Sequence, residues 1–202
     1  MAIATAAQVR VGFLRVLSGT AEDSLIDTFI ARFDDISSAY CGFPVNSNQS
    51  TFENNTYTHY FDGDGSGVLQ LRVIPANTIT SVHVDVDRDY GASSLVASSD
   101  YTLDTDEGLV ILNTDSTQGA FDKGYRSVKV IYTAGFTTIP DGIVHACGMQ
   151  VSHWYRNRDN IGFQNVSQQG GSIRVDGLQL LASTRQALAP YRLAGAIGGF
   201  LG

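Results

Sequence analysis

The stretch Val130-Ile131-Tyr132-Thr133-Ala134-Gly135-Phe136-Thr137-Thr138-Ile139-Pro140 decides the fold, because the hydrophobic period changes within it. Before Gly135, apolar residues alternate with more polar ones, which predicts a strand with a buried face. Pro140 stands where the first turn of a helix tolerates a missing N–H. The residues that follow at three- and four-residue spacing are Ile143, Val144, Cys147, Val151 and Trp154. A strand therefore leads into a long amphipathic helix.

Working outward, helices are predicted at both ends of the chain. Thr5 and Gln8 have the spacing of a capping box, which predicts a short helix to about Leu17. A second helix runs from about Thr20 to Tyr40, where Gly42 favours a left-handed stop. Its apolar face consists of Leu25, Ile26, Phe29, Phe33, Ile36 and Tyr40. A last helix spans about residues 178–189, and Pro190 is expected to stop it.

In the region between the second and third predicted helices, apolar and polar residues alternate with the two-residue period of β-strands. Gly, Asp and Asn turns separate six short segments, which is typical of an antiparallel sheet or a small sandwich. The predicted strands are 57–61, 68–74, 79–86, 100–103, 109–113 and 126–133. Residues 87–99 and 157–177 are predicted loops.

These elements predict an α+β protein. A bundle of about four helices is built from residues 1–45 and 136–192, and an antiparallel β subdomain, 56–135, is inserted into it. Residues 193–202 form a C-terminal tail in which glycine alternates with Leu, Ile and Phe. Such a tail cannot pack a core alone, so we expect a neighbouring molecule to order it.

Composition and net charge restrict the classes of protein to which this chain can belong. The chain has 202 residues, 43% of them hydrophobic, which suits one domain or one domain with an insertion. Cys41 and Cys147 are expected to be buried free thiols in a reducing compartment. No secretory signal or bilayer-spanning run is present, so a soluble protein made in the cytoplasm is expected. The net charge of −7 argues against tight, sequence-independent binding of nucleic acid.

Two runs of aspartates give only a weak sequence signal for a metal site. The run from Asp62 to Gly67 resembles the start of a calcium loop, but position twelve of that loop is Val73 rather than a glutamate. The alternation of Asp85, Asp87 and Asp89 could collect a divalent ion, although a solvated strand edge is the simpler interpretation. No metal and no cofactor is predicted, and whether either aspartate run binds an ion stays open.

Catalysis is not predicted either. The sequence has no nucleophile elbow, phosphate loop or dinucleotide fingerprint. A small hydrolase using His59 or His83 with an aspartate remains a rival that would require a nucleophile within hydrogen-bond reach. A second rival is a virion-associated β-rich module that binds a ligand or carbohydrate, based on the aromatic run 57–61; an exposed aromatic platform would support it.

Taken in order, several motifs resemble one family. These motifs are Val11-Gly12-Phe13-Leu14-Arg15-Val16, Glu22-Asp23-Ser24-Leu25, Ala39-Tyr40-Cys41-Gly42, Tyr60-Phe61-Asp62-Gly63-Asp64-Gly65, Tyr132-Thr133-Ala134-Gly135-Phe136, Ile139-Pro140, His153-Trp154-Tyr155-Arg156-Asn157-Arg158 and Ala187-Leu188-Ala189-Pro190-Tyr191-Arg192. Together they are similar to the head-to-tail connector (adaptor) proteins of tailed bacteriophages. The β region is longer than in the smallest members, and the end after Arg192 matches no family motif.

The resemblance implies an assembly role in the neck of a virion. It implies a ring of about twelve copies of the chain that docks on the portal protein and meets the next neck or tail protein. Double-stranded DNA would pass through the channel, and no membrane would be involved. The residues expected to bind the portal are Pro190, Tyr191, Arg192, Leu193, Ile197, Phe200 and Leu201. Arg156 and Arg158 are candidates for a subunit contact or a DNA-channel contact.

Overall fold

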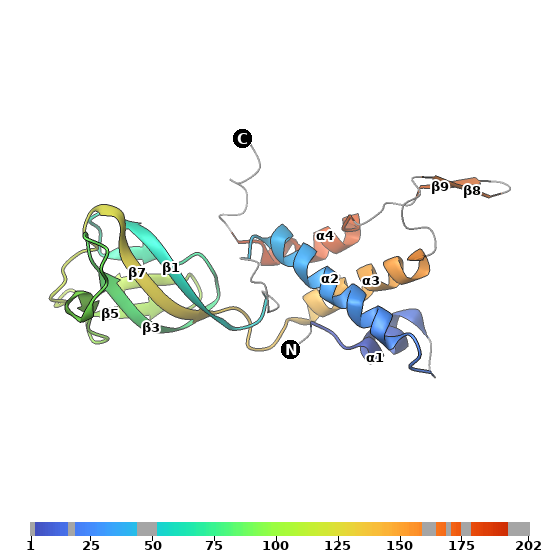
Figure 1. Cartoon of the computed structure of the whole chain (residues 1–202), viewed down its shortest axis with the longest axis horizontal. Coiled ribbons are helices and arrows are strands. Elements are labelled where there is room, and N and C mark those ends of the chain that lie inside the picture. Colours follow the sequence, from blue (N-terminus) through green and yellow to red (C-terminus); the bar gives the residue numbers. More distant parts are fainter. Residues whose placement is uncertain are drawn as a thin grey trace. The chain divides into compact units, whose positions relative to one another are not determined.

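A computed structural model describes residues 3–15, 19–43, 52–158, 165–168, 171–174 and 179–193. The chain divides into two compact units. The helical unit comprises Met1–Phe52 and Thr138–Gly202, and the β unit comprises Glu53–Thr137. Helices and antiparallel sheets are both present, so the predicted α+β class with an inserted β subdomain is confirmed (Figure 1).

The helical unit begins with the predicted capping box. The Gln8 backbone N–H donates to the Thr5 hydroxyl, and the Gln8 side-chain oxygen accepts the Thr5 backbone N–H at 2.8 Å. Helix α1, Ala6–Val9, then widens into a π-helical turn, Arg10–Leu14. The predicted short helix to about Leu17 ends earlier, at Leu14, because Arg15 takes a left-handed conformation with φ of 58°.

The second and third helices match their predicted patterns closely. Helix α2 spans Asp23–Cys41, and Gly42 ends it with φ of 82°, the left-handed cap that glycine adopts without strain. Helix α3 spans Asp141–Arg156, with Pro140 just outside its first turn. Their apolar stripes meet in the core, where Phe33 and Ile143 are fully buried.

The last helix differs from its prediction. Helix α4 spans only Ala182–Leu188, and a 3-10 turn, Ala189–Tyr191, follows it. Pro190 lies inside this 3-10 turn, so the α-helix ends before the proline, as predicted. Buried Gln150 on α3 explains the late start, because its side-chain oxygen accepts the Leu181 N–H at 2.8 Å. This bond satisfies one of the backbone donors that a helix start leaves free.

The β unit contains a four-stranded antiparallel sheet in the order β1-β7-β3-β4. Its strands are β1 Asn55–Gly63, β3 Ala76–Val84, β4 Leu95–Val96 and β7 Gly124–Ala134. Strand β7 lies between β1 and β3, with Tyr132 opposite both Tyr57 and Ile79. Val128, Val130 and Tyr132 are all fully buried, so the alternation predicted for the strand before Gly135 is confirmed. Strand β4 lies within the stretch predicted as a loop, which was wrong at this point.

A second antiparallel sheet has the order β2-β6-β5. Its strands are β2 Val68–Gln70, β5 Tyr101–Asp104 and β6 Leu109–Leu112. One of its faces is buried, with Leu69 opposite Val110 and Leu112 opposite Tyr101. Strands β1 and β2 are therefore each at the edge of their own sheet.

Two further strands lie within the predicted loop 157–177. Strand β8, Asn165–Gln168, pairs antiparallel with β9, Gly171–Arg174 (Figure 1). The expected loop was therefore wrong for this hairpin. Among the helices that the structure describes, none combines the length and apolarity needed to cross a membrane.

Candidate functional site

The segment expected to bind the portal begins on the helical unit. The Leu193 N–H donates to the Cys41 carbonyl at 2.9 Å, and the Leu193 side chain is 7% exposed. The Arg192 guanidinium lies 4.9 Å from the centre of the Tyr40 ring. Tyr191 packs against Gly142 of α3, where glycine leaves room for its ring. The last described residues are thus fixed to the end of α2, while Ile197, Phe200 and Leu201 lie outside the described residues.

This placement separates the predicted portal-binding residues into two kinds. Pro190 and Arg192 are exposed, whereas Leu193 packs within its own unit. We therefore expect Leu193 to hold the root of the tail, and any portal contact near it to come from the exposed side chains.

The arginines at the end of α3 also have partners within the helical unit. The Arg156 guanidinium donates to the Phe13 carbonyl at 3.0 Å. Arg158 stacks over the Tyr155 ring at 4.4 Å and lies 3.8 Å from a Glu22 carboxylate oxygen. These contacts tie α3 to the π-helical turn and to the start of α2. Arg156 remains exposed, so its contact with a subunit or with DNA stays a prediction.

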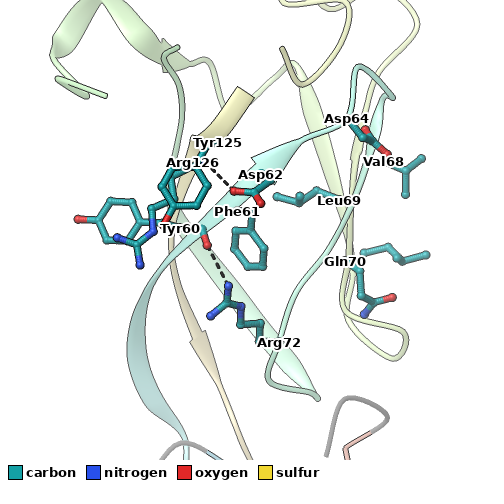
Figure 2. Close-up of a pocket in the computed structure, with 11 residues that line it drawn as sticks. Tyr60, Phe61, Asp62, Asp64, Val68, Leu69, Gln70, Arg72, Tyr125 and Arg126 are labelled. Carbon is teal, nitrogen blue, oxygen red and sulfur yellow. Dashed lines mark hydrogen bonds between the residues drawn. The ribbon is translucent and has the colours of Figure 1, made fainter. Parts of the chain in front are cut away.

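A groove lies in the β unit between the edge strands β1 and β2, with a volume of about 520 Å³. Phe61 and Leu69 point into the space between the two strands, as Figure 2 shows. The residues lining the groove are Tyr60, Phe61, Asp62, Asp64, Val68, Leu69, Gln70, Arg72, Leu109, Tyr125 and Arg126.

A bulge in β7 builds one wall of this groove. Arg126 has φ of 51°, and both Tyr125 and Arg126 face solvent. The Asp62 carboxylate accepts the Arg126 N–H at 2.7 Å, and the Tyr90 hydroxyl donates to the Arg126 carbonyl (Figure 2 shows the first bond). The backbone is therefore held from both sides in a conformation that L-residues rarely adopt.

Two arginines flank the groove without a carboxylate partner among the described residues. The Arg72 guanidinium donates to the Tyr60 carbonyl at 3.1 Å and lies 5.3 Å from the centre of the Phe61 ring. The Arg126 guanidinium lies over the Tyr60 and Tyr125 rings at 5.7 and 5.6 Å. Aromatic faces attract cations in this geometry, so both side chains are oriented before any ligand arrives.

The sequence indicated this groove only in part. Tyr60 and Phe61 of the aromatic run 57–61 line it, but Tyr57 and Phe61 are buried, so the run does not form the exposed aromatic platform that a ligand-binding module required. Tyr125, which is 65% exposed, was not singled out. The dipeptide Tyr125-Arg126 beside a predicted turn was the one available signal.

The aspartate runs act as turns. Asp64 accepts the Ser66 N–H at 2.8 Å, and bonds from Ser66 hold the pKa of the Asp64 carboxyl below its usual value. Asp85 accepts backbone N–H groups from Asp87, Arg88 and Tyr90. In the part of the chain that the structure describes, no group of three or more His, Cys, Asp or Glu residues is arranged to hold a metal.

The two candidate histidines lie in ordinary structural settings. His83 Nδ1 is 3.3 Å from the Ser94 hydroxyl, but this hydroxyl donates to the Gly91 carbonyl at 2.9 Å. No carboxylate bonds to His83 among the described residues, so the pair of His83 and Ser94 lacks the group that would orient a catalytic base.

Both cysteines are free and buried, and burial raises the pKa of the Cys41 thiol to about 12. Thiol chemistry at neutral pH is therefore not favoured.

His59 is half-buried beside other aromatic rings of the β unit. Its Nδ1 is 2.9 Å from the Tyr132 hydroxyl, which also accepts the Val73 N–H at 3.3 Å. Its ring stacks on Tyr57 at 5.6 Å. Burial, and secondarily the charge of Arg72, lowers the pKa of His59. Neutral His59 is thus the form that the folded β unit accommodates.

We expect the β unit to lose stability in mild acid through His59. Because its folded pKa lies below the unfolded value of about 6.5, the contribution is complete above that pH and is lost as the pH falls through and below it. The free energy of unfolding in urea should fall between pH 7.5 and pH 5, and it should fall less for His59→Gln than for the unmodified chain. Hydrogen exchange of the β unit measures the same difference locally. Equal losses in the two proteins would contradict the assignment to His59.

Both the sequence and the fold are similar to those of known proteins. A family model described as "Head completion protein" matches residues 3–193. A chain in a solved structure described as "Neck of empty GTA particle computed with C6 symmetry" has a similar fold, with a TM-score of 0.57. The two chains are 15% identical over 98% of this chain and 93% of that chain. No curated protein matches the sequence.

Proposed function

Because this chain belongs to the head completion protein family, we propose that it is a structural adaptor of the virion neck, forming a closed ring that docks on the portal and lets DNA pass to the tail. Membership of the family confirms the resemblance to tailed-phage head-to-tail connectors, and with it a structural role in the neck. The match over residues 3–193, nearly the whole chain, is the observation that carries the proposal.

Ring formation is supported by symmetry. The chain with the similar fold belongs to a neck that was computed with C6 symmetry. Identical subunits joined by a head-to-tail contact close into a ring when their rotation closes, and a ring of about twelve copies is compatible with sixfold symmetry. The exposed Arg156 at the end of α3 is our candidate for the contact between neighbouring subunits.

Docking on the portal is assigned to the tail. Residues 194–202 are apolar and rich in glycine, and they follow a root that is fixed by the bond from Leu193 to Cys41. A short apolar segment with a fixed root can enter a cleft on a partner without losing the fold of its own unit. Repeated around a ring, a modest contact of this kind becomes a stable joint.

Passage of DNA is supported by the distribution of charge. The β unit carries 12 acidic and 5 basic residues, a balance of −7, while the helical unit carries 8 of each. A surface of this sign does not retain the phosphate backbone. We infer that the chain forms a channel or collar that DNA passes without lasting attachment.

Removal of residues 194–202 should abolish the joining of heads to tails while the protein stays folded. The cut leaves the Leu193–Cys41 bond intact, so thermal unfolding should match that of the full chain. Electron microscopy of portal-bearing heads mixed with either protein measures the joining. Heads that acquire tails normally with the shortened protein would contradict the role of the tail.

One further variant and one further measurement extend this test. A full-length variant with Ile197, Phe200 and Leu201 changed to serine removes the apolar side chains but keeps the length, and it should behave like the truncation. Native mass spectrometry of the unmodified chain, alone and with portal, measures the ring directly. A chain that stays monomeric in the presence of portal would contradict ring formation, whatever the tail does.

A further inference from the structure

The groove between β1 and β2 has no part in the proposed function. The net charge of its lining residues indicates which kind of ligand it can bind. Arg72 and Arg126 offset Asp62 and Asp64 among the lining residues, so the lining is neutral although the β unit carries −7. A strongly charged ligand would therefore gain little from this wall. Neutral polar ligands are favoured.

The groove offers hydrogen-bond donors and acceptors on planar side chains. Arg126 has no hydrogen-bonded partner for its guanidinium among the described residues, so its N–H groups are available. Asp62 uses one carboxylate oxygen for a backbone N–H and keeps the other, whereas the Asp64 carboxylate is bonded by Ser66. Gln70 donates its amide to the Glu107 carbonyl at 2.7 Å and keeps its oxygen as an acceptor. The wall can therefore both donate to a hydroxyl and accept from it.

An exposed aromatic ring stands beside these groups. Tyr125 is 65% exposed, although a buried ring of this size would contribute strongly to stability. The bulge at Arg126, held by Asp62 and Tyr90, keeps the neighbouring Tyr125 turned outward. The apolar face of a flat ligand can stack on such a ring while its edges reach the polar side chains.

From these features we propose that the groove binds a neutral saccharide. Sugar rings present apolar C–H faces together with hydroxyls that donate and accept, and this matches a lining that holds an exposed tyrosine together with planar donors and acceptors. The volume of about 520 Å³ is that of a site for a short oligosaccharide.

Addition of a peptide strand is disfavoured at the same place. The Ser66 hydroxyl donates to the Val68 carbonyl at 2.9 Å and accepts the Val68 N–H at 3.4 Å, so it occupies both backbone groups of that residue at the strand edge. The Arg72 guanidinium occupies the Tyr60 carbonyl on the opposite strand. A strand that paired here would first have to displace these side chains.

Isothermal titration of the full chain with maltotriose, cellotriose and chitotriose tests the proposal. We expect saturable binding of at least one of them, and Tyr125→Ala should weaken it about tenfold, the size of effect expected when one stacked aromatic contact is lost. Val86→Ala is the matched control, because Val86 is 52% exposed in the same unit and does not line the groove. It should bind like the unmodified chain.

Three outcomes would overturn the saccharide site. They are the absence of binding to all three sugars, equal binding by Tyr125→Ala, and binding of an alternating Val/Thr decapeptide in place of the sugars. The proposed neck function is measured separately, because Tyr125→Ala should still form rings and join heads to tails.

Discussion

Replacing Gly135 by alanine should destabilise the β unit by about 3 kcal/mol or more, because strain and overlap act together. Gly135 has φ of 108°, a conformation that L side chains rarely adopt. A Cβ at this position would also overlap the Glu53 carbonyl, which is backbone and cannot rotate away. Hydrogen exchange of the β7 amides measures the loss within the β unit.

Gly119→Ala is the control for Gly135→Ala. Gly119 has φ of 70°, but a Cβ there would meet nothing within 4 Å. It therefore carries the conformational cost alone, about 1 kcal/mol. If the two variants lose equal stability, the overlap with Glu53 contributes nothing and the account of Gly135 is wrong.

Gly148→Ala should destabilise the helical unit by about 2 kcal/mol. Gly148 is buried on α3, and a Cβ there would overlap the Phe13 ring. The Arg156 bond holds the Phe13 carbonyl, and the Phe13 ring contacts the His145 ring at 5.4 Å, so withdrawal of the ring would disturb this contact. The Phe13 ring, or the π-helical turn that carries it, would have to move away from α3 to admit the methyl group.

The single tryptophan makes this loss measurable. Trp154 lies on α3, so its fluorescence during urea unfolding reports the helical unit. Gly12→Ala is the matched control, because a Cβ there meets nothing within 4 Å and φ is not positive; it should be neutral or about 0.5 kcal/mol more stable. A Gly148→Ala protein as stable as this control would show that Phe13 adjusts freely.

Local patterns were sufficient for the elements whose ends and faces are set by neighbouring residues. Helix α2 was predictable because its apolar stripe and its glycine stop both lie within the segment itself. Strand β7 was predictable from Val128 onward because its alternation decides which side chains are buried. The insertion of a β region between helices followed from the change of period near Gly135.

Tertiary structure alone decided the features that depend on distant partners. Alternation carried back from Val128 would bury Arg126, but Asp62, 64 positions away, bonds its N–H, and both Tyr125 and Arg126 face solvent beside the groove. Helix α4 begins at Ala182 because Gln150, 31 positions before Leu181, takes the N–H of that residue. A periodic pattern records which face of an element is apolar, whereas hydrogen bonds between segments far apart in sequence leave no local period. Sequence therefore determined the class, the insertion and the family resemblance, and folding in three dimensions determined the groove and the root of the tail.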